Sequence, residues 1–396
     1  MRVPAGSSRP KRQVSEACQD LAAQLASRII GQPAAVSQII PYVEMFQAGL
    51  SPEGRPVGVV LLLGPTGTGK TRTVEALAEV IHGSERHLLR IDCGEYQMDH
   101  EVAKLIGAPP GYLGHRETQP MLNQQRLNAA TSERSPLSLV LFDEIEKAAP
   151  SLTRLLLGVL DRATLRLGDN SSVNFETSLV FLTSNLGARE MLRELNPDFG
   201  FQAGVRRPRP DLAEKLESIA LGAVRRTFSP EFVNRVDVVI TYQPLDGEAL
   251  AAILEQQLAE LQRHINYRLG ERAFALDVPP EAREWLLRCG TSPEYGAREL
   301  KRTMHRHLMQ PLAALVAAAR IEPGMRVRVE PDPAGEGLLL RARGAGILEW
   351  LPGSWGQPPG AVPACRAKAA TAEAEPSLRA AAPEAVPKPR LRFDSP

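Results

Sequence analysis

Short apolar runs alternate with longer segments of helical periodicity in the part of the chain before Pro244. The apolar runs span residues 57–63, 88–93, 138–143, 178–183 and 236–241. Apolar side chains recur at helical spacing at residues 14–27, 36–43, 70–81 and 151–160. Strands that are apolar throughout and alternate with helices are typical of a parallel sheet buried on both faces. The pattern therefore predicts an α/β domain with helices on both sides of a parallel sheet.

The pattern changes after Pro244. Helical spacing continues at residues 247–265 and 297–319, and short strand-like runs lie at 273–278, 325–329 and 337–340. This mixture predicts a second, smaller α+β domain. Proline and alanine dominate from Pro352 onward with little apolar periodicity, which favours disorder.

These changes divide the chain into four predicted parts. They are a flexible N-terminal tail at residues 1–13, a large domain at 14–244, a small C-terminal domain at 245–345 and a disordered Pro/Ala-rich tail at 346–396. Within the large domain, residues 196–211 combine prolines and glycines with arginines, so we expect a mobile loop insertion there.

Composition narrows the class of protein. The chain has 396 residues with 43% hydrophobic content, enough for two or three domains with substantial cores. Its 47 basic and 46 acidic residues give a formal charge of +1, which argues against a nucleic-acid or anionic-membrane partner. No apolar run reaches membrane-spanning length. The four cysteines are scattered without a C-x-x-C pair, as expected of reduced thiols in the cytoplasm; they are Cys18, Cys93, Cys289 and Cys365.

A phosphate-binding sequence directly follows the first apolar run. The match to G-x-x-x-x-G-K-[ST] consists of Gly64, Pro65, Thr66, Gly67, Thr68, Gly69, Lys70 and Thr71. A glycine turn between a buried strand and a helix points backbone amides at phosphate oxygens. Lys70 is expected to contact the terminal phosphates of ATP, and the Thr71 hydroxyl to hold Mg²⁺, which prefers oxygen ligands.

Polar residues end two later apolar runs. Asp143 and Glu144 follow one run, and alternation along a strand sends their side chains in different directions. Asp143 is then expected on the magnesium side, with Glu144 polarising the water that attacks the γ-phosphate. Asn185 follows the next run and is a candidate for positioning the same water, although asparagine is also a common turn residue.

Together these motifs resemble those of the AAA+ ATPases. The segments at residues 143–148 and 183–187 narrow the resemblance to the Clp unfoldases, and within them to the second ATPase module of the two-ring Clp proteins. The resemblance spans residues 15–335. It implies an AAA+ P-loop fold with a parallel sheet covered by helices, followed by a small α+β Clp-type domain. It also implies a hexameric ring that hydrolyses ATP and pulls protein substrates through a central pore.

The resemblance assigns further residues. Residues 107–114 match the Clp pore loop, whose aromatic residue grips the substrate and stands here at Tyr112. The family's usual acidic, glycine-rich run after this tyrosine is replaced at residues 115–120, which puts the pore electrostatics in question. Arg235 matches the arginine finger that reaches a neighbouring subunit's γ-phosphate, and Arg298 matches the sensor that contacts phosphate in its own subunit. The segment matching the adenine pocket consists of Ile30, Gly31 and Gln32.

Other functions remain open from the sequence. One is a regulatory or assembly AAA+ ATPase that switches protein contacts without threading a chain. Another is a nucleic-acid motor or clamp loader, which the near-neutral charge and the pore motif disfavour. Residues 199–201 loosely resemble a tripeptide with which some Clp unfoldases dock a ring peptidase, but Phe199 departs from the pattern. The sequence identifies no substrate or adaptor.

Overall fold

The computed structural model describes residues 11–107, 120–195, 212–292, 295–333, 337–343 and 348–349. Four sequence predictions lie outside these residues. They concern the first ten residues, the pore segment with Tyr112, the loop at 196–211 and the C-terminal tail from residue 350.

The large domain contains a five-stranded parallel sheet, in the order β2-β3-β6-β1-β7. The strands are β1 (Gly58–Leu63), β2 (Leu89–Asp92), β3 (Ser138–Asp143), β6 (Ser178–Ser184) and β7 (Val238–Thr241). Every residue of β1, β3 and β6 is buried, which explains their unbroken apolar sequences. The five predicted strands are confirmed, with ends that differ by at most two residues.

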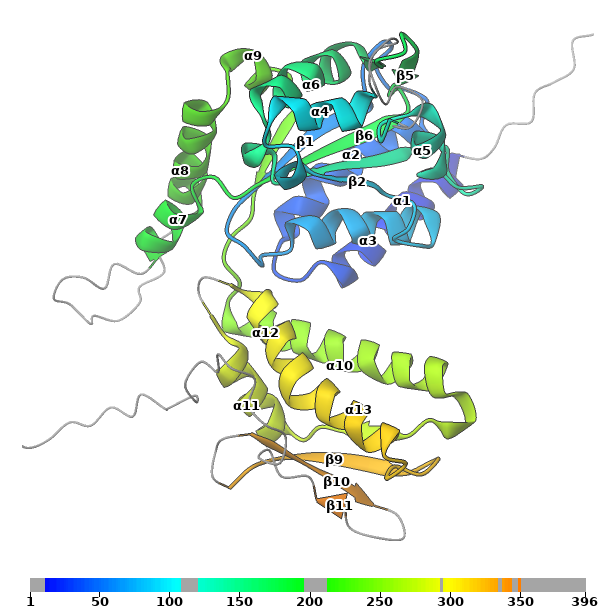
Figure 1. Cartoon of the computed structure of the whole chain (residues 1–396), viewed down its shortest axis with the longest axis vertical. Coiled ribbons are helices and arrows are strands. Elements are labelled where there is room, and N and C mark those ends of the chain that lie inside the picture. Colours follow the sequence, from blue (N-terminus) through cyan, green and yellow to red (C-terminus); the bar gives the residue numbers. More distant parts are fainter. Residues whose placement is uncertain are drawn as a thin grey trace, which may run out of the picture. The chain divides into compact units, whose positions relative to one another are not determined.

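Helices cover both faces of this sheet, as the sequence predicts (Figure 1). Alternation along β1 sends Val60 and Leu62 to one face and Val59 and Leu61 to the other. The first face packs against α1 (Lys11–Arg28), α2 (Pro33–Gln47) and α3 (Lys70–His82). The second packs against α4 (Asp99–Ile106), α5 (Gln124–Ala129), α6 (Pro150–Arg162), α7 (Ala188–Leu195), α8 (Leu212–Thr227) and α9 (Pro230–Val233).

Short elements complete the large domain. Two 3₁₀ turns, η1 (Cys93–Glu95) and η2 (Ile145–Lys147), follow β2 and β3. A hairpin of β4 (Thr164–Arg166) and β5 (Ser172–Asn174) follows α6. These segments have too few residues for a periodic signal and were not predicted from the sequence.

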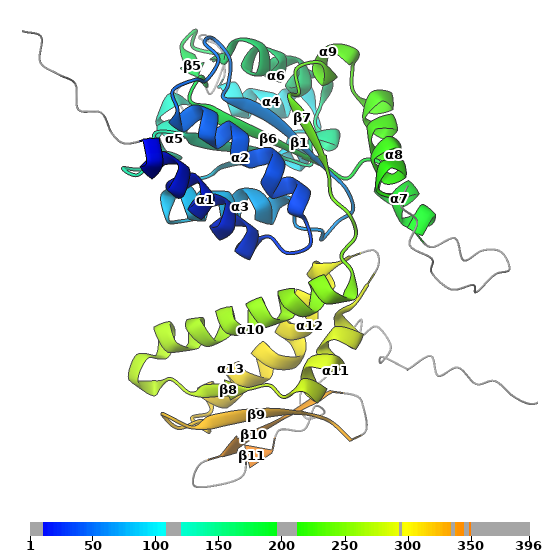
Figure 2. The same cartoon turned by 180° about the vertical axis from the view of Figure 1, so that it is seen from behind.

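The small domain packs helices on a four-stranded sheet of order β11-β10-β9-β8 (Figure 2). Its strands are β8 (Ala275–Asp277), β9 (Arg326–Pro331), β10 (Leu338–Arg343) and β11 (Leu348–Glu349). Its helical elements are α10 (Gly247–Leu269), η3 (Gly270–Arg272), α11 (Pro280–Gly290), α12 (Ala297–Met304), η4 (His305–Met309) and α13 (Gln310–Ala317). Trp285, Leu300 and Leu308 belong to its apolar core.

The predicted single helix at residues 297–319 is interrupted by one π-helical segment, η4. Pro311 supplies the physical reason. Proline lacks the amide hydrogen for the regular helical bond and its ring collides with the carbonyl four residues earlier, so the helix widens just before it. None of the described helices is long and apolar enough to cross a membrane.

Candidate nucleotide-binding site

The loop between β1 and α3 has the backbone shape of a phosphate cradle. Gly64 has φ +142°, and a Cβ there would lie 2.6 Å from the Tyr242 carbonyl oxygen. Gly69 precedes α3 with φ +105° and forms no side-chain cap, so it leaves the first amides of that helix available to an anion. Only glycine suits both positions, because L side chains rarely adopt such φ values.

Lys70 is turned back onto this loop. Its Nζ donates to the carbonyl oxygens of Gly64 at 2.7 Å and Pro65 at 2.9 Å, and to Asn185 Oδ1 at 2.8 Å. Burial lowers the pKa of Lys70 to about 8, and the Glu146 carboxylate partly opposes this effect. These three neutral acceptors leave a buried positive charge that phosphate oxygens would stabilise further.

Thr71 and Asp143 form an oxygen-rich pair at the carboxyl end of β3. The Thr71 hydroxyl lies 3.4 and 3.5 Å from the two Asp143 carboxylate oxygens. Asp143 Oδ1 also accepts a 2.5 Å hydrogen bond from the Thr183 hydroxyl. A hydroxyl beside one carboxylate fits Mg²⁺, which takes few protein ligands and completes its shell with phosphate and water. No cluster of three or more His, Cys, Asp or Glu suited to a metal occurs among the described residues.

Glu144 lies beside Asp143 but points to different partners. Its Oε2 is 2.5 Å from Lys147 Nζ, and its Oε1 accepts from Asn185 Nδ2 at 3.3 Å. Its backbone is left-handed, with φ 57° and ψ 50°, and its amide donates to the Thr183 hydroxyl at 2.9 Å. Asn185 therefore joins Glu144 to Lys70 across the site.

Gln32 connects the start of α2 to the opposite edge of the loop. Its side-chain Nε2 donates to the Gln243 carbonyl at 2.7 Å and to the Thr68 carbonyl at 3.4 Å. Its Oε1 accepts from the Gln243 amide at 3.2 Å. Backbone groups beside the phosphate loop thus hold the Gln32 side chain in place. The preceding residue, Gly31, has a left-handed backbone with φ +77°. Ile30, the third residue of the predicted adenine segment, is half-buried beside them.

The structure brings Arg298 toward this site. The amide of Ala297 donates to the Gly67 carbonyl at 3.1 Å, and the Arg298 charge contributes to lowering the Lys70 pKa. A groove of about 590 Å³ along α12, η4 and the start of α13 is lined by Arg298, Lys301, Arg302, His305, Arg306 and Gln310. The phosphate loop therefore has a second cation nearby.

Arg235 contacts other groups. Its guanidinium lies 3.6 Å from Asp161 of α6 and 3.3 Å from Glu231 of α9, and it donates to the Glu231 carbonyl at 2.7 Å. These contacts hold Arg235 against α6 and α9, and none of its described contacts joins it to Lys70. Tyr112 lies outside the described residues.

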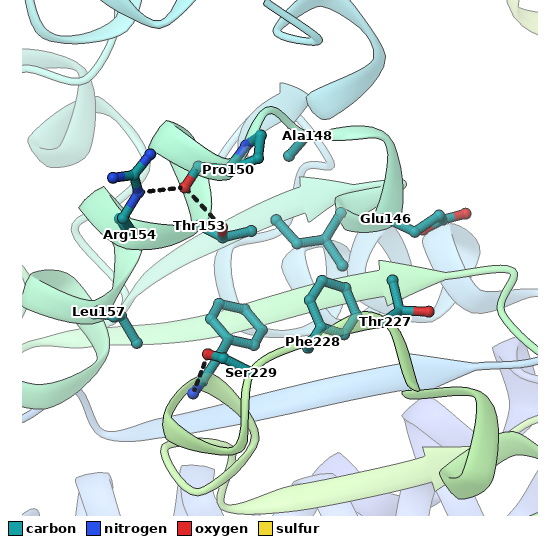
Figure 3. Close-up of a pocket in the computed structure, with 11 residues that line it drawn as sticks. Glu146, Ala148, Pro150, Thr153, Arg154, Leu157, Thr227, Phe228 and Ser229 are labelled. Atoms are coloured by element: carbon teal, nitrogen blue, oxygen red, sulfur yellow. Dashed lines mark hydrogen bonds between the residues drawn. The ribbon is translucent and has the colours of Figure 1, made fainter. Parts of the chain in front are cut away.

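A separate cavity of about 340 Å³ lies between α6 and the segment that begins α9 (Figure 3). Phe228 and Leu157 are among its walls, and Glu146 borders it. The Thr153 hydroxyl and Arg154 Nε both donate to the Pro150 carbonyl, so these polar groups are satisfied within their own helix. The cavity offers apolar walls and no converging donors, unlike the phosphate loop.

Four residues of the site were not predicted from the sequence. Thr183 orients both acids, Lys147 pairs with Glu144, and Arg90 Nη2 lies 2.5 Å from Asp143 Oδ2. Glu146 Oε1 accepts from the Asn185 amide at 3.1 Å. Thr183, Glu146 and Lys147 lie inside the two segments that suggested the Clp resemblance, but no pattern marked Arg90.

Comparisons with known proteins agree with this geometry. A family model described as "AAA domain (Cdc48 subfamily)" matches residues 55–239. A second, "C-terminal, D2-small domain, of ClpB protein", matches residues 245–329. The order of the parallel strands, the phosphate loop and the acid pair thus define an ATPase module of the AAA+ class. Within that class the chain belongs to the Clp family and corresponds to its C-terminal ATPase module, which confirms the resemblance and the predicted fold class.

Individual relatives show how much of a Clp protein the chain represents. It is 37% identical over 320 residues to the chaperone protein ClpB of Meiothermus ruber, covering 81% of this chain and 34% of that protein. For ClpB of Pseudomonas putida the identity is 39% over 310 residues, covering 78% and 33%. The chain spans about a third of the length of these relatives.

Solved structures of Hsp104 share the fold. The closed state with ATPγS and FITC-casein superposes with a TM-score of 0.68 at 26% identity, covering 84% of this chain and 52% of that one. The extended Saccharomyces cerevisiae Hsp104:casein complex gives the same TM-score and identity, covering 84% and 53%.

Proposed function

We propose that this chain hydrolyses ATP with Mg²⁺ and uses the cycle to unfold or remodel protein substrates. The observation that supports hydrolysis best is the network at the carboxyl ends of β1, β3 and β6, where Asn185 bonds to both Lys70 and Glu144. Ligands of parallel α/β sheets bind at this edge. The Hsp104 structures with casein support a protein substrate.

Each residue of the network has a proposed role. Lys70 exchanges its loop carbonyls for phosphate oxygens, and Thr71 with Asp143 holds the magnesium ion, which would neutralise phosphate charge. Glu144 accepts the proton of the attacking water once its carboxylate is freed from Lys147, and Asn185 orients that water. Ile30, Gly31 and Gln32 border the adenine.

The ring is part of the proposal. We infer a homo-hexamer in which Arg235 completes the neighbouring subunit's site, Arg298 contacts phosphate in its own subunit, and Tyr112 grips polypeptide in the pore. A ring peptidase that docks at residues 199–201 is an additional candidate partner, and an adaptor is another, with no docking site assigned. A cytoplasmic location fits the scattered cysteines without a C-x-x-C pair and the free thiol of the buried Cys93, and we propose no nucleic-acid or membrane partner.

Electron microscopy of the Glu144→Gln protein with ATP tests the ring. We expect nucleotide-filled closed rings with polypeptide in the channel, because the substitution keeps the phosphate cradle and removes only the carboxylate that handles water. Monomers with bound nucleotide would contradict the hexamer.

Tyr112→Ala tests threading. The variant should retain basal ATP hydrolysis and lose forced unfolding of a tagged fluorescent reporter, because alanine removes the contact surface of a large amphipathic ring. Tyr112→Phe is the matched control and should retain most unfolding activity. Unfolding by Tyr112→Ala at the wild-type rate would favour the regulatory ATPase that switches contacts without threading.

A further inference from the structure

Asp143 Oδ2 has two neighbours that compete for it. Arg90 Nη2 lies 2.5 Å from this oxygen, and the Thr71 hydroxyl lies 3.5 Å from it. The other oxygen, Oδ1, is bonded to Thr183. Asp143 is only 8% exposed, so few other directions of approach to its carboxylate remain.

Arg90 reaches this position from the neighbouring strand. In the parallel pairing of β2 with β3, Arg90 lies opposite Leu141, two residues before Asp143. Its side chain is 49% exposed, so it has room to change direction.

A second carboxylate lies within reach of the same guanidinium. Arg90 Nη1 is 3.7 Å from Glu75 Oε1 on α3. Glu75 also lies 3.8 Å from Arg72, so it already belongs to a group of paired charges on that helix. A guanidinium has several donors in one plane and can exchange one carboxylate for another by a small rotation.

We propose that Arg90 is a positioning residue that holds Asp143 Oδ2 until a divalent cation binds, and then transfers to Glu75. The inference rests on the proposed magnesium–nucleotide site. An arginine donor and a metal ion, or its bound water, cannot use the same carboxylate lone pairs, and the two positive charges repel each other. Cation binding on the Thr71 side therefore favours release of this oxygen by Arg90.

The test measures Mg²⁺-dependent binding of a fluorescent ATP analogue to the full chain with Glu144→Gln, which avoids hydrolysis. Adding Arg90→Gln should lower the Mg²⁺ concentration for half-maximal binding by about threefold to tenfold, because a competing ion pair is lost. Binding measured in EDTA should not change. Glu75→Gln should shift the Mg²⁺ response in the opposite direction, because Arg90 then has only Asp143 to pair with.

Arg86→Gln is the matched control. It removes the same charge at an exposed position four residues earlier and should leave the Mg²⁺ response unchanged. Thermal unfolding of each variant checks that it is folded, and the opposite shift in Glu75→Gln keeps the inference testable if Arg90→Gln is unstable.

Two results would overturn the inference while leaving the proposed function intact. One is a nucleotide-binding Arg90→Gln protein whose Mg²⁺ response is unchanged or weakened. The other is a loss of affinity in EDTA, which would mean that Arg90 contacts the nucleotide itself. If the parent Glu144→Gln protein bound no nucleotide at all, the proposed function would fail, and this inference would fail with it.

Discussion

Thr183 shows how one buried side chain can order two acids. Its hydroxyl donates to Asp143 Oδ1 and accepts from the Glu144 amide. Thr183 therefore connects β6 to the end of β3, where the proposed magnesium ligand Asp143 is followed by the proposed base Glu144. A single residue thus fixes both the magnesium carboxylate and the backbone of the proposed base.

Thr183→Val should damage the site more than its small change in shape suggests. Valine keeps the volume and leaves a buried amide and a buried carboxylate oxygen without this partner, so we expect a loss of about 1–3 kcal/mol in the free energy of unfolding. ATP hydrolysis should fall as well. Urea denaturation and turnover measure the two effects, and Thr183→Ser, which keeps the hydroxyl, should remain close to wild type in both.

His82 predicts a pH dependence of stability. Burial lowers its pKa to about 4, with the neighbouring His87 adding to the effect. Between about pH 6.5 and pH 4 the unfolded chain binds a proton at this position and the folded protein does not, so the free energy of unfolding falls as the pH falls. The contribution is about 1.4 kcal/mol per pH unit within that window.

The variant His82→Gln should show a shallower fall than wild type between pH 6.5 and pH 4.5 in urea denaturation. His100→Gln is the control, because His100 is exposed, and it should keep the wild-type slope. Equal slopes in His82→Gln and wild type would contradict the assignment.

At the scale of elements, the five buried strands of the large domain were predicted, whereas α8, the 3₁₀ turns and the β4–β5 hairpin were not. β3 was predicted to the residue because six consecutive buried positions leave a sequence signal that exposed segments lack. The π-helical segment η4 was not predicted, because the apolar residues around it keep helical spacing. The cause of the π-helix is Pro311, whose ring displaces the carbonyl four residues earlier in the chain. The predicted domain boundaries remain predictions.

The packing of α11 on α12 gives an element-scale prediction. A Cβ on Gly290 would lie 2.8 Å from Leu300 Cδ1 and 2.9 Å from Leu300 Cα, so Gly290→Ala must push the two helices apart. We expect a loss of about 1–3 kcal/mol in stability, as in other overpacked cores. The urea midpoint followed by circular dichroism measures it. Gly247→Ala adds the same methyl group with no atom within 4 Å, and a comparable loss in that control would contradict the steric explanation.

At the scale of the whole molecule, the sequence predicted where the site lies but not the ion pairs within it. Lys70, Thr71, Asp143, Glu144 and Asn185 were all selected from strand-end motifs, and the fold brings them together. Lys147 and Arg90 could not be found this way, because an ion pair depends on which side chains meet in space. Arg235 has its described contacts away from Lys70, as expected if its proposed target lies in another subunit.

Mixing experiments test that arrangement. Arg235→Ala subunits should bind ATP but hydrolyse it at least about 100-fold more slowly, because an arginine finger contributes about 10³ to 10⁵ in rate. Combined with Glu144→Gln subunits, they should recover turnover where an intact Arg235 faces an intact Glu144. Arg226→Ala, an exposed arginine paired with Glu190, is the control and should hydrolyse normally. Verified mixed rings without recovery would rule out action between subunits.

The left-handed backbone of Glu144 places stability and chemistry in opposition at a single position. Any side chain with a Cβ is strained there by about 1–2 kcal/mol, whereas glycine is not. In most folded segments replacing alanine with glycine weakens a protein, but here Glu144→Gly should unfold at a higher urea concentration than Glu144→Ala. The backbone at position 144 alone would favour glycine. The difference in the free energy of unfolding between Glu144→Gly and Glu144→Ala therefore measures the stability that is lost by keeping a side chain, and with it a carboxylate, beside Asp143.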